Sequence, residues 1–170
     1  NDAGEYYQMA WVLGRTGIVY NKTVLDSIFK EGYSLPVTTR ELEQFAADIK
    51  TKNVYPFSYA SSTDYLAYII GIWKAQYAGY NAYNEAFSAC YYDENGELKL
   101  DTDGSQTIGN VSTRRALETG TRIFAKKSGN MHAYASSMSF TEAQAAFLGH
   151  GYKNQDMKQV AMMCNGEWLG

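Results

Sequence analysis

The chain has 170 residues, of which 45% are hydrophobic and 19% are charged, a composition typical of a globular domain. Its net charge of −3 argues against a nucleic-acid partner, which would require a basic stripe. No apolar stretch approaches the roughly 18 residues of a membrane span. The length is sufficient for one domain with its own core, so we expect a single globular domain.

The first third of the sequence predicts a strand and two helices. A short β-like run covers residues 17–20, and a helical pattern over 24–29 follows it and ends at Gly32. Thr38 and Glu41 have the spacing of a capping box. The apolar residues that follow recur at i, i+3, i+4 and i+7, which predicts an amphipathic helix.

The middle of the chain predicts an edge strand and a helix that is apolar on most sides. Residues 54–59 resemble a strand, and Pro56 favours a place at the edge of a sheet. Residues 61–64 can all act as N-caps for a helix that reaches residue 77, and its apolar surface predicts burial on several sides. A shorter helix over 80–89 and a hairpin turn at Asn95-Gly96 come next.

The last third predicts two more helices and a closing strand. The first helix covers 111–127, with Leu117, Gly120 and Phe124 facing inward. The second begins with a capping box at residues 139–142 and ends at residue 149 or 151, and a strand over 159–164 follows a polar loop. Strands separated by helices indicate a helix-rich α/β fold with a small sheet.

Histidine and cysteine usage gives no support for a metal or redox site. His132 and His150 belong to no zinc motif, and each is expected at the surface. Cys90 and Cys164 share no motif either, so a disulfide stays open and two buried thiols are the preferred interpretation. We expect no cofactor.

The acidic stretch "DENGELKLDTDG" at 93–104 raises the question of calcium. An EF-hand loop requires glycine at its sixth position, but the sixth residue is Leu98 or Gln106 in the two registers tested. A solvated hairpin is the preferred interpretation. A pair of catalytic carboxylates is not excluded, because such pairs meet only in the fold.

Four segments in a fixed order carry a family resemblance. They are "GIVYNK" at 17–22, Pro36 to Leu42, the Phe-rich stretch 140–147, and Ala161-Met162 with a G-x-W turn at 166–168. Together they resemble the extracellular solute-binding proteins of ABC transporters, most closely the sugar-binding branch that includes maltodextrin-binding proteins. The chain departs from the family pattern at Thr39, where the family has Trp, and in the longer polar loop before residue 161.

The resemblance implies a periplasmic-binding-protein-like type II fold. Residues 1–170 would be most of one lobe of a two-lobe protein, with the N-terminal lobe and a C-terminal segment outside this chain. Such a protein binds a carbohydrate, in particular an oligosaccharide, between its lobes and delivers it to the permease subunits of a bacterial importer. It would be a monomer without enzymatic activity, extracytoplasmic, and either periplasmic or lipid-anchored at the cell surface through an anchor outside this chain.

The G-x-W turn is the first candidate ligand site. In the family this turn lies at the cleft beside the hinge, which implies that Trp168 stacks on a sugar ring, with Glu167 and Asn165 nearby. The alternative is that Trp168 only packs against a following helix.

The loop at 61–65 is the second candidate, because ligands in α/β proteins lie outside the carboxyl ends of strands and near helix starts. Its candidate residues are Ser62, Thr63, Asp64 and Tyr65. Asp64 is the preferred contact, since a carboxylate accepts hydrogen bonds from two sugar hydroxyls. The alternative is plain N-capping by Ser62 or Thr63.

Two other functions stay open. A carbohydrate-active enzyme domain would need two acidic groups that converge in a cleft of this chain. An interaction domain would keep the lobe fold without a ligand, and its cleft face would lack an exposed Trp168 and Asp64.

Overall fold

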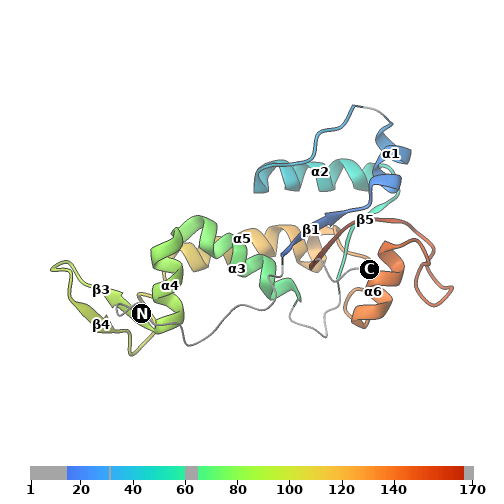
Figure 1. The fold of residues 1–170 in the computed structure, drawn as a ribbon. Coiled ribbons are helices and arrows are strands. Elements are labelled where there is room, and N and C mark those ends of the chain that lie inside the picture. Colours follow the sequence, from blue (N-terminus) through green and yellow to red (C-terminus); the bar gives the residue numbers. More distant parts are fainter. Residues whose placement is uncertain (1–14, 31, 60–64, 167–170) are drawn as a thin grey trace.

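A computed structural model describes residues 15–30, 32–59 and 65–166 of the chain (Figure 1). In chain order the elements are β1 (Thr16–Tyr20), α1 (Lys22–Phe29), α2 (Thr39–Thr51), β2 (Tyr55–Ser58), α3 (Tyr65–Ala78), α4 (Tyr80–Ser88), β3 (Cys90–Tyr92), β4 (Leu98–Leu100), α5 (Val111–Phe124), the short 3-10 helix η1 (Lys126–Ser128), α6 (Phe140–Phe147) and β5 (Val160–Gly166). This is the helix-rich α/β fold with a small sheet that the sequence predicts.

The main sheet has three strands in the order β1-β5-β2. The central strand β5 pairs antiparallel with β1 and parallel with β2. Pro56 therefore lies in an edge strand, as predicted. The strand β5 extends two residues beyond the predicted end at 164, to Gly166, because its pairing with β1 continues to Thr16.

Helices cover both faces of this sheet and form two apolar cores. Alternate residues of β5 point to opposite faces. Met162 and Cys164 join the larger core with α1, α2, α3 and α5, whereas Met163, which lies between them in the strand, packs with α6. In Figure 1 the helices α1 and α2 lie on one side of the strands and α6 lies on the other.

Two capping boxes fix where α2 and α6 begin. At α2, the Thr38 hydroxyl accepts the Glu41 N–H at 3.2 Å, and the Glu41 carboxylate accepts the Thr38 N–H at 3.1 Å. Ser139 and Glu142 make the same reciprocal pair at the start of α6. Both boxes were predicted from residue spacing, and both helices place their apolar face on the sheet.

Asn21 connects four elements at the end of β1. Its side-chain oxygen accepts the Val24 N–H at 3.1 Å and so caps α1, while its amide nitrogen donates to the Phe147 carbonyl at the end of α6 at 2.8 Å. Its backbone N–H donates to the Ala161 carbonyl of β5 at 2.8 Å. The residue therefore ties β1, α1, α6 and β5 together.

The crossing of α3 and α5 corrects two predictions. Gly120 and Phe124 face inward as expected, but Leu117 is 53% exposed, because the buried face of α5 passes through Ala116, Gly120 and Ile123. The helix α3 is not buried on several sides: Ile69 and Trp73 are buried, whereas Tyr68 is 52% exposed. Its uniformly apolar sequence therefore overstates its burial.

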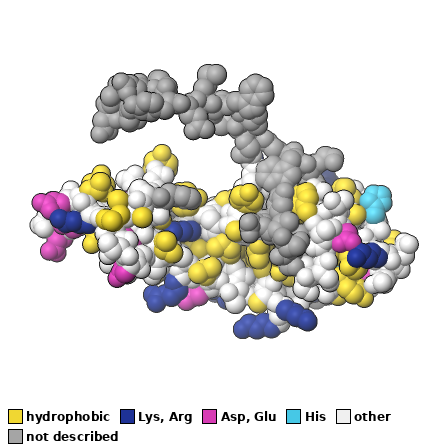
Figure 2. Space-filling view, turned by 90° about the horizontal axis from the view of Figure 1, so that it is seen from below, with side chains coloured by type: hydrophobic (Ala, Val, Ile, Leu, Met, Phe, Trp, Pro, Cys, Tyr) yellow, Lys and Arg dark blue, Asp and Glu magenta, His cyan; other side chains and the backbone are white. Residues whose placement is uncertain are grey.

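A two-stranded hairpin, β3 with β4, follows α4 and projects from the rest of the described chain in Figure 1. Its turn lies where the sequence predicts it, since the Gly96 N–H donates to the Asp93 carbonyl at 2.9 Å. Figure 2 shows acidic and basic side chains scattered over one face of the molecule, without a continuous basic stripe on that face.

Candidate functional site

The topology of the main sheet brings to one edge the two strand ends that precede the predicted ligand segments in the sequence. The strands β2 and β5 are parallel, so both carboxyl ends, Ser58 and Gly166, point to the same edge. The antiparallel strand β1 begins at that edge with Thr16, which pairs with Gly166. Residues 60–64 follow β2 in the sequence and residues 167–168 follow β5. In α/β proteins ligands bind outside this carboxyl edge.

Asn165 is the predicted site residue whose side chain the structure describes. It is 3% exposed, and its amide oxygen accepts the Gly166 N–H at 2.8 Å. Its amide nitrogen has the Met163 sulfur at 3.6 Å, which is a weak acceptor. One N–H of this NH₂ group therefore has only the weak Met163 acceptor, and the other has no acceptor among the described residues, at the place where the strand reaches the carboxyl edge.

A hollow of about 340 Å³ lies against Asn165. Its other walls come from Arg15, Gly166 and the β1 residues 16–19. Gly17 pairs with Asn165 across the two strands, and nothing lies within 4 Å of the position that a Cβ atom would take at Gly17. The first turns of α3 reach the same place, since Tyr68 and Ile69 lie against Thr16 and Asn165.

The structure brings one predicted residue to this hollow, and it adds two that the sequence analysis missed. Arg15 and Thr16 line the hollow only because β1 runs antiparallel to β5, and no local sequence pattern shows that pairing. The other predicted ligand residues, Ser62, Thr63, Asp64, Glu167 and Trp168, lie outside the described residues, as does the side chain of Tyr65. Among the described residues, the helix α3 extends from Tyr65 to Ala78.

The acidic loop after β4 has a structural role. The Asp101 carboxylate accepts the Thr107 N–H and hydroxyl, both at 2.7 Å, and the Gln106 N–H at 3.1 Å. Asp103 accepts the Ser105 N–H at 2.9 Å, and this hydrogen bond is the main reason why its pKa is lowered. These carboxylates stabilise the turn, and the described residues hold no group of three potential metal ligands.

The described walls of the hollow hold neither a reactive thiol nor an acidic side chain. Burial raises the pKa of the Cys164 thiol to about 12, so it stays protonated and unreactive at neutral pH. No acidic residue belongs to the described walls of the hollow. Cys164 is buried, as preferred, but Cys90 is only half-buried, and neither forms a disulfide.

His132 is not at the surface, contrary to the prediction, whereas His150 is exposed. The His132 ring packs 4.4 Å from the ring of Tyr55, and its Nδ1 accepts the Tyr134 N–H at 3.2 Å. Burial lowers the pKa of His132, and the Asp156 carboxylate, 3.9 Å from Nε2, offsets this only in part. A histidine that packs through its ring has no sequence signal of its own.

Asp156 closes this aromatic cluster at the amino edge of the sheet. Its carboxylate accepts the hydroxyl of Tyr55 at 2.9 Å and the backbone N–H of Lys158 at 2.9 Å. Burial alone would raise the pKa of Asp156, but these hydrogen bonds outweigh it and the pKa is lowered. The cluster lies at the edge opposite Asn165, so it stabilises the loops there and does not form part of the hollow.

Comparison with known proteins identifies the fold. The chain superposes on a chitin oligosaccharide binding protein with a TM-score of 0.66 and 18% identity, over 91% of this chain and 32% of that one. It superposes on the apo form of RafE from Streptococcus pneumoniae with a TM-score of 0.65 and 20% identity, over 92% of this chain and 34% of that one. The chain thus spans about a third of the length of either neighbour.

These likenesses confirm the predicted fold class, a helix-rich α/β fold of the periplasmic-binding-protein-like kind. No protein-family model matches the chain, and no curated protein matches it significantly. None of the helices in the described part of the chain combines the length and the apolarity that crossing a membrane requires.

Proposed function

We propose that this chain is most of one lobe of the substrate-binding component of an ABC importer, and that the whole protein captures a carbohydrate between two lobes. The observation that carries the proposal is the shared carboxyl edge of β2 and β5. There the two candidate loops follow neighbouring parallel strands, next to the buried amide of Asn165. One neighbour of the same fold is by name a chitin oligosaccharide binding protein.

In this proposal the carboxyl edge is one wall of the cleft. Trp168 covers a C–H face of the sugar, Asp64 and the loop around it accept hydrogen bonds from its hydroxyls, and Asn165 donates to a ring or hydroxyl oxygen. Ligand binding closes the two lobes by hinge motion, and the closed form docks on the permease. The protein then works as an extracytoplasmic monomer without catalysis, held to the membrane only by an anchor outside this chain.

Calorimetry on the full-length protein, guided by a glycan array, tests the proposal. We expect one oligosaccharide class to bind, and Trp168→Ala to weaken its binding by at least about tenfold through loss of the stacked ring. The control is Tyr80→Ala, which removes an aromatic ring that is 79% exposed on α4, and it should leave the affinity unchanged. Tight binding of a peptide or polyamine with no oligosaccharide binding would refute the choice of carbohydrate.

The isolated 170 residues give a second test. Because each lobe supplies only part of the contacts, this chain alone should bind the same oligosaccharide far more weakly than the whole protein. Micromolar binding by the isolated chain would contradict the two-lobe proposal.

A further inference from the structure

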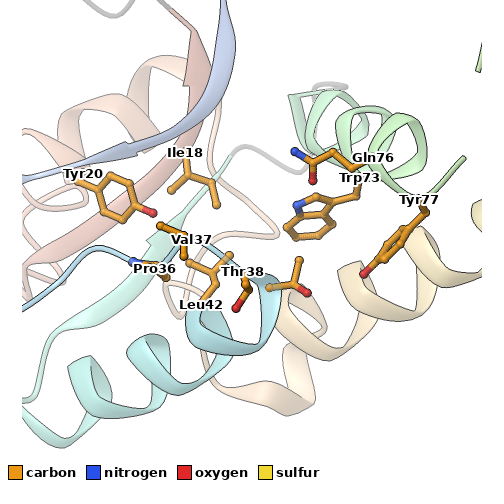
Figure 3. A pocket seen from close by; sticks show the side chains of 10 residues that line it. Ile18, Tyr20, Pro36, Val37, Thr38, Leu42, Trp73, Gln76 and Tyr77 are labelled. Carbon is orange, nitrogen blue, oxygen red and sulfur yellow. The ribbon is translucent and has the colours of Figure 1, made fainter. Parts of the chain in front are cut away.

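A second pocket lies between β1, α2 and α3, on the face of the main sheet that packs in the larger core (Figure 3). Its volume is about 250 Å³. The walls come from Ile18 and Tyr20 of β1, from residues 36–42 at the start of α2, and from residues 73–77 of α3. Apart from Ile18, no residue of this pocket lines the hollow at the carboxyl edge.

Aromatic rings form two of its walls. Trp73 is buried, with one face of the indole stacked on Phe124 at a centroid distance of 5.7 Å, and Figure 3 shows its ring beside the open space. The hydroxyl of Tyr77 hydrogen bonds to the Thr119 hydroxyl at 3.0 Å, which holds that ring in place. The walls are therefore preorganised.

Polar groups without a hydrogen-bond partner among the described residues face the same space. The hydroxyl of Tyr20 and the side-chain amide of Gln76 make no hydrogen bond to another described residue. Figure 3 shows the Tyr20 hydroxyl pointing from β1 toward the open space and Gln76 above the indole. The Thr38 hydroxyl is engaged in its capping box, where it accepts the Glu41 N–H and also bonds to the Glu41 carboxylate.

The described walls carry no formal charge, so nothing in them compensates an ionic ligand. Tyr20 is half-buried, so an apolar guest would leave its hydroxyl without a hydrogen bond, which disfavours a hydrophobic side chain or a lipid tail. A neutral polyhydroxylated ring satisfies both requirements, since its C–H face packs on an aromatic ring and its hydroxyls bond to amides and hydroxyls. Pockets for drug-sized ligands measure about 300–1,000 Å³, so this one suits a single ring.

We propose that this pocket is a second carbohydrate site, which binds one neutral pyranose ring outside the cleft of the two-lobe protein. This site goes beyond the proposed function, because its residues come from β1, α2 and α3 and not from the loops at the carboxyl edge. A single shallow ring site of this kind should bind weakly, with a dissociation constant on the order of 1 mM.

Nuclear magnetic resonance on the ¹⁵N-labelled chain tests the proposal. D-glucose, D-galactose and N-acetyl-D-glucosamine are titrated separately, and at least one should give saturable shifts of the Trp73 indole N–H and the Gln76 side-chain amide. D-glucuronate should shift these signals at least about fivefold less effectively, because its carboxylate finds no cation in the described walls.

Matched variants assign the shifts to the pocket. Gln76→Leu keeps the size of the side chain but removes its hydrogen bonds, and it should weaken the binding by about fivefold or more. Gln44→Leu is the control, because Gln44 lies on the exposed side of α2 and bonds to Asp48 there. The control should titrate like the unaltered chain, and the melting temperatures of both variants report whether they fold.

Three results would overturn the proposal. One is the absence of saturable shifts with all three neutral sugars, and another is an unchanged affinity in Gln76→Leu. The third is a set of shifts confined to residues around Asn165, which would move the sugar to the carboxyl edge and support the proposed function instead. The experiment therefore distinguishes a failure of the second-site proposal from a failure of the proposed function at the cleft.

Discussion

Replacing Gly151 with alanine tests the packing of the tight loop before β5. Gly151 has a φ of +68°, and a Cβ atom there would lie 2.7 Å from the Asp156 carbonyl oxygen and 2.5 Å from the Met157 sulfur. The left-handed conformation costs a non-glycine residue about 1–2 kcal/mol. The clash with a backbone atom adds about 1–3 kcal/mol. Gly151→Ala should therefore lower the free energy of unfolding by about 2–5 kcal/mol.

Gly129→Ala separates the two contributions. Gly129 has a φ of +66°, and nothing lies within 4 Å of the position that a Cβ atom would take there. This variant should therefore show the conformational cost alone, about 1–2 kcal/mol. Urea denaturation followed by circular dichroism measures both variants against the unaltered chain. If the two variants agree within about 0.5 kcal/mol, the contact with Asp156 contributes nothing and the reasoning is refuted.

Three other predictions concern burial, capping and pH. Phe57 is fully buried and meets Phe124 edge to face at 5.0 Å, so Phe57→Ala should lower the free energy of unfolding by about 3–5 kcal/mol in urea denaturation, and a loss below about 1 kcal/mol would contradict its place in the core. Thr38→Ala removes the cap of α2 and should lower the same quantity by about 1 kcal/mol, whereas an unchanged value would show that the capping box is not formed in solution. Burial lowers the pKa of His132 from 6.5, so the folded chain binds fewer protons than the unfolded chain and stability should fall as the pH drops below 6.5. The ordinary pKa of an aspartate such as Asp156 is 3.8 and the pKa is lowered here, so its contribution to the free energy of unfolding is lost only at lower pH. The variant His132→Gln should flatten the stability profile between about pH 7 and pH 5, and a slope equal to that of the unaltered chain would argue against this assignment.

Most of the elements that were predicted correctly follow from interactions between residues close together in the sequence. The two capping boxes and the apolar periodicity of α2 depend on residues within a few positions of one another, so spacing alone located them. The edge position of Pro56 follows from its missing N–H in the same way. The exposure of Leu117 could not be predicted in this way. It depends on how α5 packs against α3, and helical periodicity in the sequence does not give that packing.

The candidate site was less predictable because it depends on pairing between distant strands. Asn165 was selected from a resemblance, and the hollow beside it exists only because β1 returns antiparallel and places Gly17 opposite. The burial of His132 is of the same kind, since its neighbours Tyr55 and Asp156 are remote in the sequence. The involvement of Trp168 and Asp64 in binding stays a prediction.

The structural role of Asn21 determines what the sequence Tyr20-Asn21-Lys22 indicates about a protein that contains it. Its three connections join β1, α1, α6 and β5 at the amino side of β5, on the far side of the sheet from Asn165. The most recognisable stretch of this sequence therefore encodes architecture, and it lies away from the carboxyl edge of the sheet that holds Asn165. Proteins identified by this short sequence should share the fold while they bind different ligands. Loops at 60–64 and 167–170 could in principle be exchanged between such scaffolds without disturbing the joint that Asn21 makes.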